Sequence, residues 1–303
     1  MAEPFTLQFY VSLQEDGVLL REYLAQKNIS KTALTDIKYH GGKILVNSKE
    51  ETVRYTVRSG DQVVIQFPPE QSSARMKSAA IPLDIIYEDD FILIVNKPAG
   101  MSTIPSHEHP DHTLANAIVY HYAQSGHNSA IHFVTRLDYD TSGLVLVAKH
   151  RHIHHLFSLA QQEQAIDKEY LAFIEGTIEP TTGEINRPIA RIDHSIIKRE
   201  VRPDGQAART RYTTKQVFQI GDKQYSMLQL QLLTGRTHQI RVHLQSLGHP
   251  LLGDSLYGGE CIHIKRQALH CVKLQFDHPI TGEKLCFECP LPGDMQFLCN
   301  YTT

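Results

Sequence analysis

The sequence predicts an α+β fold with a mixed, largely antiparallel sheet, preceded by a small α+β domain. β-branched and aromatic segments outnumber helical patterns and do not alternate regularly with them, as they would in a doubly wound fold. Residues 69–81 are rich in Pro, Ser and Ala and have no apolar period, which is typical of a linker. This stretch divides the 303-residue chain into a small domain at 12–68 and a larger one at 82–299.

The small domain is expected to hold two helices followed by two strands. Apolar spacing indicates helices over 18–24 and 33–39, and Ser30 is expected to cap the second helix. Two consecutive Gly residues end that helix, and β-branched runs then predict strands over 43–47 and 60–65.

In the larger domain, strands outnumber helices. Apolar β-branched runs predict a strand pair over 85–95, a strand, loop and strand over 133–149, and further strands over 170–175, 211–220 and 225–233. Helical spacing predicts helices over 113–122, 154–165 and 236–247, the last of them ended by Gly248.

The charge balance hides an asymmetry. The formal net charge is −3 and the pI is about 6.6, which on its own does not suggest a nucleic-acid partner. Residues 76–190, however, hold 7 basic and 14 acidic side chains, whereas 191–303 hold 14 and 10. The stretch 187–215, which crosses the boundary between these two segments, carries eight Lys or Arg against three Asp or Glu. Such a segment is either a solvated surface loop or a face for nucleic acid.

Several classes of protein are disfavoured. No apolar run approaches the roughly 18–20 residues of a membrane span, and the first residues lack a signal-peptide pattern. The five Cys all follow residue 260, and an odd number without an export signal favours reduced thiols in the cytoplasm. Cys286 and Cys289 form a CxxC, but on the strand expected there they would point to opposite faces. With no heptad pattern or apolar interface helix, we expect a monomer.

The richest polar loop contains Asp138. It lies between two apolar segments and is composed of Asp, Thr, Ser and Gly, so a plain β-turn is one interpretation. Three other segments, at 96–101, 168–170 and 233–243, also concentrate polar and charged side chains. The last of these places more polar groups at the start of a helix than a solvated face requires. Together, the four segments indicate an active site.

The segments RLDYDTSGLVLVAK, KEYLAFIEG and LLTGRTHQIRVHLQSLGHPLLGDSLYG together resemble the RluA/RluD-type family of RNA pseudouridine synthases. YEDDFILIVNKPAGM upstream, and LHCVKLQFDHPITGE and PLPGDM downstream, extend the resemblance over roughly 82–295. Residues 12–68 are similar to an S4-like RNA-binding domain through their two helices, the ILVN strand and RSGDQVVI.

The resemblance implies a pseudouridine synthase-like catalytic domain that isomerises uridine in structured RNA. The C1′–N1 bond breaks, the base rotates, and a C1′–C5 bond forms. No cofactor is expected, in line with the absence of GxxxxGK[ST] and GxGxxG motifs. Large-subunit ribosomal RNA is the favoured substrate because of the S4-like domain, and transfer RNA is the alternative.

The same resemblance assigns roles at the reaction centre. Asp138 matches the catalytic carboxylate, and Arg241 matches the cation that keeps it ionised beneath a flipped base. Tyr170 matches the tyrosine that stacks on the target base, and Arg136 matches an arginine near the flipped nucleotide. Attack of Asp138 at C1′, its addition at C6 and its assistance in glycal formation all remain open.

A second set of residues is expected to support the site or to bind RNA. Thr135 takes the position of the family's usual His, while His238 and Gln239 are expected to bond backbone or ribose groups and to hold Arg241. The supporting set is Thr135, Thr141, Ser142, Gly143, Arg236, His238 and Gln239. RNA contacts are expected from Arg136, Lys31, Lys38, Arg187, Arg191, Lys198, Arg199, Arg202, Arg209 and Arg211.

Two other functions compete with an RNA isomerase. One is an RNA-binding assembly factor with an inactive site, suggested by Thr135 in place of His. The other is a metal hydrolase, suggested by 18 His residues, among them an HxHxxH at 107–112 and a cluster at 150–155. Because HExxH is absent and the isomerisation needs no metal, we expect no metal site.

Overall fold

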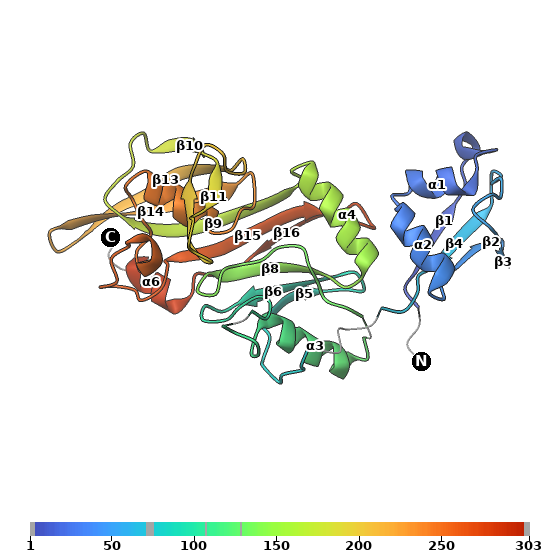
Figure 1. Cartoon of the computed structure of the whole chain (residues 1–303), viewed down its shortest axis with the longest axis horizontal. Helices are drawn as coiled ribbons and strands as arrows, with labels where there is room; N and C mark the ends of the chain where they lie inside the picture. The colour runs from blue at the N-terminus through green and yellow to red at the C-terminus, as the bar shows by residue number, and fades with distance from the viewer. Residues whose placement is uncertain (1–3, 71–75, 107, 128, 300–303) are drawn as a thin grey trace.

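A computed structural model places a four-stranded sheet at one end of an elongated molecule and a ten-stranded sheet at the other (Figure 1). The structure describes residues 4–70, 76–106, 108–127 and 129–299. The predicted linker at 69–81 therefore lies partly outside the described residues. Within the described ranges, no helix is long and apolar enough to cross a membrane.

The N-terminal unit is a four-stranded antiparallel sheet with two helices. Its strands lie in the order β1, β4, β2, β3. Ser30 caps the second helix as predicted, because its hydroxyl accepts a hydrogen bond from Ala33 N at 3.1 Å. The first strand precedes residue 12, the expected start of this domain, and pairs with β4. The bounds are β1 Thr6–Tyr10, α1 Leu20–Gln26, α2 Lys31–Tyr39, β2 Lys43–Val46, β3 Lys49–Glu50 and β4 Gln62–Gln66.

The larger unit is built on one mixed sheet. Its path is β10-β13-β14-β9-β15-β8-β6-β5, with β16 beside β15 and β7 beside β8. Among the described residues every pairing in this sheet is antiparallel except that of β8 with β15, so the predicted sheet type is confirmed. The strands are β5 Ile85–Glu88, β6 Ile92–Lys97, β7 His132–Phe133, β8 Ser142–Ala148, β9 Ile166–Glu175, β10 Thr182–Asn186, β13 Arg209–Ile220, β14 Lys223–Leu232, β15 Leu269–Asp277 and β16 Lys284–Glu288.

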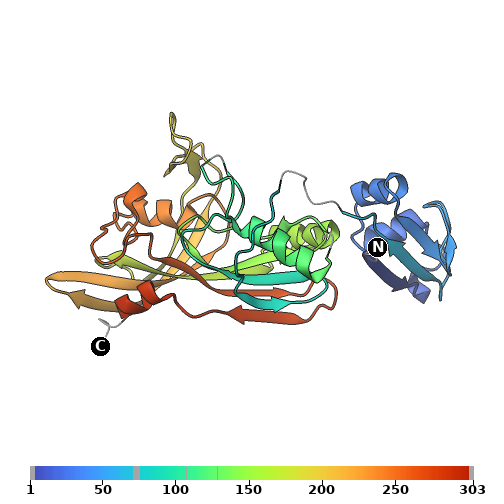
Figure 2. The ribbon, with the colours of Figure 1, turned by 90° about the horizontal axis from the view of Figure 1, so that it is seen from below.

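Helices α3, α4 and α5 lie on one side of this sheet, and the β11–β12 hairpin projects from the same side (Figure 2). Two of these helices start three residues away from the predicted position. α4 begins before residue 154 because His150 adopts the extended N-cap conformation. α5 begins after residue 236 because His238 is left-handed, with φ of 56°. The bounds are α3 Leu114–Ser125, α4 Arg151–Gln162, β11 Ile189–Arg191, β12 Arg199–Val201, α5 Gln239–Ser246 and α6 Gly293–Cys299.

The N-terminal unit docks on the start of α4. Phe5 stacks on His150 with ring centroids 3.9 Å apart, and Phe67 stacks on His152 at 5.2 Å. The same contact includes an ion pair, in which Arg151 Nη1 lies 2.6 Å from the Oδ2 atom of Asp36 on α2. Burial lowers the pKa of both histidines to about 4, so they are neutral near pH 7 and pack as aromatic rings.

The histidines and cysteines weighed as metal ligands do not converge. Cys286 is exposed and Cys289 is buried, so the two thiols diverge as predicted. In the part of the chain that the structure describes, no three His, Cys, Asp or Glu side chains are grouped so that they could hold a metal ion. His107 of the HxHxxH motif lies outside that part.

The parallel pairing of β8 with β15 joins segments far apart in the chain. Ser142 pairs with His270 and Gly143 with Cys271. Gly143 has φ of +115°, and a Cβ built there would lie 2.5 Å from Cys271 N and overlap its carbonyl oxygen. Only glycine fits this position, and the close approach fixes the end of the loop that carries Asp138.

Replacing Gly143 with Ala should lower the free energy of unfolding by about 3 kcal/mol, because the added Cβ forces β8 and β15 apart. Urea unfolding would measure the loss. Gly221→Ala is a matched control, since Gly221 also has positive φ (+61°) but no atom lies within 4 Å of the added Cβ. The control should cost about 1 kcal/mol. Equal losses in the two variants would mean that the approach to Cys271 is not the constraint.

Candidate active site

Asp138 lies in a loop whose backbone is fixed on both sides. On one side, Leu137 exchanges two hydrogen bonds with the Thr103 hydroxyl, at 2.8 and 3.2 Å. On the other side, the Tyr139 carbonyl accepts from Met101 N at 3.2 Å and from Lys97 Nζ at 3.1 Å. The Asp138 side chain is still 28% exposed. A carboxylate is thus presented to solvent from a rigid loop.

A buried arginine contacts this carboxylate. Arg241, in the first turn of α5, lies with Nη1 3.1 Å from Asp138 Oδ2. Its Nε and Nη2 donate to the two oxygens of Asp254 at 2.7 and 2.8 Å. Burial opposes the charged form of Arg241, but the hydrogen bonds to Asp254 and the charges of both carboxylates raise its pKa above the usual value. Arg241 is therefore a permanent cation directed at Asp138.

Tyr170 is a buried side chain near Asp138. It lies on β9, paired in register with Cys271 of β15, and is 5% exposed. Burial raises the pKa of its phenol well above the usual value, and the neighbouring Cys271 and Asp138 raise it further. The ring therefore presents a neutral, largely apolar surface near Asp138.

Lys97 ties two of the predicted polar segments together. It is fully buried, and its ammonium donates to the carbonyls of Pro98, Met101 and Tyr139 at 2.9, 2.7 and 3.1 Å. Burial lowers its pKa to about 7, although the charges of Asp138 and Asp140 act in the opposite direction. Sequence reasoning did not single out Lys97, but the NKPAGM segment that contains it was a usable signal.

The supporting residues of the Asp138 loop bind other strands. Thr135 accepts a hydrogen bond from Leu146 N at 2.9 Å, so its hydroxyl is used by the backbone of β8. Thr141 accepts from Gln267 Nε2 at 3.2 Å, and Ser142 lies 2.9 Å from His270 Nδ1. These contacts fasten the loop to β8 and to the start of β15.

The supporting residues before α5 fall into two groups. Gln239 is buried and its amide makes four hydrogen bonds: it accepts from Thr234 and Arg236 N and donates to Arg209 O and Thr210. This network fastens the start of α5 to β13. Arg236 is exposed and donates to Ala207 O at 3.0 Å. His238 instead approaches the carboxylate itself, with Nε2 3.9 Å from Asp138 Oδ2.

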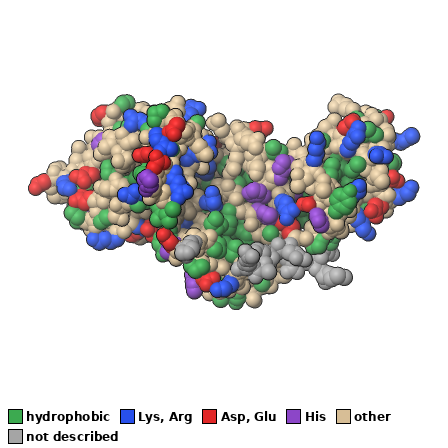
Figure 3. Space-filling model, viewed as in Figure 1, with side chains coloured by type: hydrophobic (Ala, Val, Ile, Leu, Met, Phe, Trp, Pro, Cys, Tyr) green, Lys and Arg blue, Asp and Glu red, His purple; other side chains and the backbone are tan. Residues whose placement is uncertain are grey.

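The basic segment divides into paired and unpaired cations. Arg202 contacts three carboxylates, and Arg209 and Arg211 share Glu184. Among the described residues, no ion pair involves Arg136, Arg187, Arg191, Lys198 or Arg199. Three of these lie on the β11–β12 hairpin, whose loop also exposes Ile196 and Ile197. Figure 3 shows Lys and Arg side chains interspersed with Asp and Glu on this part of the molecule.

Lys31 and Lys38 lie on α2, in the unit at the opposite end of the molecule from β10–β14 (Figure 1). Lys38 is over the ring of the exposed Tyr39, with Nζ 4.9 Å from the centroid. The structure thus does not bring these two lysines next to Asp138.

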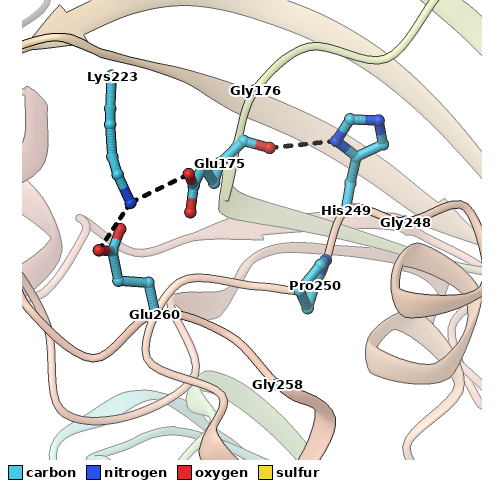
Figure 4. Close-up of a pocket in the computed structure, with 8 residues that line it drawn as sticks. All are labelled: Glu175, Gly176, Lys223, Gly248, His249, Pro250, Gly258 and Glu260. Atoms are coloured by element: carbon cyan, nitrogen blue, oxygen red, sulfur yellow. Dashed lines mark hydrogen bonds and ion pairs between the residues drawn. The ribbon is translucent and has the colours of Figure 1, made fainter.

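A second pocket shares no residue with the Asp138 site (Figure 4). Glu175, Lys223, His249 and Glu260 line it, and Lys223 Nζ lies 3.2 and 2.9 Å from the two glutamates. Lys223, the cation of this pocket, is thus already paired with both glutamates.

Known proteins match both the fold and the sequence. A family model described as RNA pseudouridylate synthase matches residues 91–246. The uncharacterised RNA pseudouridine synthase YjbO of Bacillus subtilis strain 168 is 46% identical over 92% of this chain and 97% of its own. Ribosomal large subunit pseudouridine synthase D of Vibrio parahaemolyticus is 38% identical over 84% of this chain and 81% of its own. The structure of human RNA Pseudouridylate Synthase Domain Containing 1 superposes with a TM-score of 0.58 at 26% identity, covering 70% of this chain and 85% of its own.

The residues that the family model matches include both Asp138 and Arg241. The relatives and the solved structure extend the similarity over most of the chain. These matches confirm the prediction of an isomerase acting on RNA. By sequence and by fold, this chain belongs to the RNA pseudouridine synthase family.

Proposed function

We propose that this enzyme isomerises uridine in large-subunit ribosomal RNA in the cytoplasm, with Asp138 as the catalytic carboxylate. The observation that carries the proposal is the contact between the partly exposed Asp138 and the buried Arg241. A flipped uridine over Asp138 would exclude water and favour the protonated acid. The guanidinium, held by Asp254, counteracts that shift and keeps the carboxylate ionised for reaction at the nucleoside.

Two further side chains are assigned to the flipped nucleotide. Tyr170 would stack on the target base, which its neutral, buried ring supports. Arg136 is exposed two positions before Asp138 and would contact the RNA beside the flipped nucleotide. Phosphate contacts of the unpaired cations would offset the few kcal/mol that base flipping costs.

The choice of ribosomal RNA is supported by relatives named ribosomal large subunit pseudouridine synthase D from Vibrio, Haemophilus and Nitrosomonas species, at 36–38% identity. Mapping pseudouridines in ribosomal and transfer RNA from cells with and without the protein tests the choice. Loss of sites in large-subunit RNA is expected. Loss confined to transfer RNA would overturn this part of the proposal and leave the reaction intact.

Asp138→Asn should abolish the release of tritium from RNA labelled at uridine C5, because the amide cannot act as the ionised carboxylate. RNA binding should change less than threefold. Asp140→Asn is the matched control, since it makes the same change in the same loop, and it should remain active. Activity retained by Asp138→Asn would mean that another carboxylate carries the reaction.

Changing Arg191, Lys198 and Arg199 together to Gln should weaken RNA binding at least tenfold and reduce the salt dependence of log K by about 2, as expected for three lost phosphate contacts. The Arg202, Arg209 and Arg211 triple change to Gln removes the same charge but only cations already paired with carboxylates. Titrations at several salt concentrations should show a clearly smaller effect for the second triple. Equal effects would argue that net charge, not the unpaired hairpin cations, governs binding.

A further inference from the structure

We propose that His238, oriented by the hydroxyl of Tyr257, is a positioning residue that presents an N–H group to Oδ2 of Asp138. The inference rests on the proposed role of Asp138 as the catalytic carboxylate. It gives a defined role to His238, which the sequence had placed in the supporting set, and adds Tyr257, which sequence reasoning did not single out. The signal for Tyr257 was the DSLYG segment within the family resemblance.

The hydrogen bonds of Tyr257 select the tautomer of His238. The Tyr257 oxygen accepts a hydrogen bond from Arg199 N at 3.0 Å and lies 2.9 Å from His238 Nδ1. If Nδ1 carried the proton, this oxygen would accept twice, and the described residues would offer the proton of this half-buried tyrosine no other acceptor. The hydroxyl therefore donates to Nδ1. The proton of the neutral imidazole is then on Nε2, the atom that faces Asp138 Oδ2 at 3.9 Å.

The surroundings keep the imidazole neutral. Its side chain is 11% exposed, and burial lowers its pKa, while the charge of Asp138 acts in the opposite direction. The other charged groups near it are Arg241, Arg199 and Asp254. A neutral ring has one N–H to give, so the direction set by Tyr257 decides whether Asp138 faces a donor or a lone pair.

The backbone is strained to place this ring. His238 is the N-cap residue of α5, yet it has φ of 56° and ψ of 22°, and its side chain makes no capping hydrogen bond. N-cap residues normally have extended backbone and side chains that bond the first helical N–H groups. A non-glycine residue in the left-handed region costs free energy, and the side chain that causes this cost is directed at Tyr257 and Asp138.

Both contacts to the carboxylate come from one helix start and are oriented by one turn. His238 and Arg241 are three residues apart and both approach Oδ2. Asp254 binds the guanidinium, and Tyr257 lies under it, with the Arg241 Cζ atom 5.0 Å from the ring centroid. In the described part of the chain, Asp138 Oδ1 makes no hydrogen bond. Arg241 therefore holds Oδ2 by a hydrogen bond, His238 Nε2 faces the same oxygen from 3.9 Å, and Oδ1 is left for the nucleoside.

A double-mutant cycle tests this arrangement. Rates of tritium release at saturating RNA would be measured for the wild type, Tyr257→Phe, His238→Gln, the double variant and His238→Ala. Tyr257→Phe keeps the ring under Arg241 but removes the proton given to Nδ1, so kcat should fall at least tenfold with KM within twofold. The Gln side chain offers an N–H near the position of Nε2 without help from Tyr257. His238→Gln should therefore keep at least a third of wild-type kcat.

In the Gln background, Tyr257→Phe should cost less than twofold, because the orienting bond is no longer needed. The cycle also cancels the loss of the Arg199 N–H partner, which occurs in both backgrounds. His238→Ala should lower kcat at least tenfold, and thermal unfolding would show whether it folds. If His238→Ala does not fold, the effects of Tyr257→Phe in the wild-type and His238→Gln backgrounds still test the inference.

Equal effects of Tyr257→Phe in the two backgrounds would overturn the inference. Wild-type kcat in folded His238→Ala would overturn it as well. Measuring Asp138→Asn alongside separates this failure from failure of the proposed function, since an active Asp138→Asn contradicts the role of Asp138 itself.

Discussion

A guanidinium buried in protein must have carboxylate partners, and this constraint organises the site. Arg241 and Asp254 have side chains only 7% and 1% exposed, so neither charge is stable without the other. Their two parallel hydrogen bonds fix the first turn of α5 against the turn at 254–257. A third N–H of Arg241, on Nη1, then contacts Asp138. The buried ion pair thus links the turn after α5 to a loop about 100 residues earlier in the chain.

The sheet supplies the frame for that convergence. The parallel pairing of β8 and β15 brings Ser142 beside His270, and the glycine that follows allows the two backbones to touch. The hydroxyls of Thr141 and Ser142 bond residues at this junction, and that of Thr135 bonds the backbone of β8, so none of the three is directed at Asp138. The loop is consequently rigid because of its neighbours, while the partly exposed Asp138 keeps an oxygen with no hydrogen bond from the described residues.

Features that depend on residues close together in the sequence were predictable. The Ser30 cap, the divergence of Cys286 from Cys289 and the mixed sheet follow from local pattern. The strands β1 and β15 were not predicted, because their place depends on pairing with distant strands. Asp254 and Tyr257 look like ordinary turn residues until the fold brings Arg241 and His238 to them. The resemblance to pseudouridine synthases selected Asp138, Tyr170 and Arg241, whose assigned roles stay predictions.

The docking of the N-terminal unit gives β8 a second role. This strand begins next to the Asp138 loop and ends at Ala148, two residues before His150, on which that unit rests. Its seven residues span about 20 Å. The strand therefore keeps a fixed separation between the reaction centre and the surface that the N-terminal unit contacts. If α2 binds RNA, the length of β8 contributes to the distance between that contact and the target uridine.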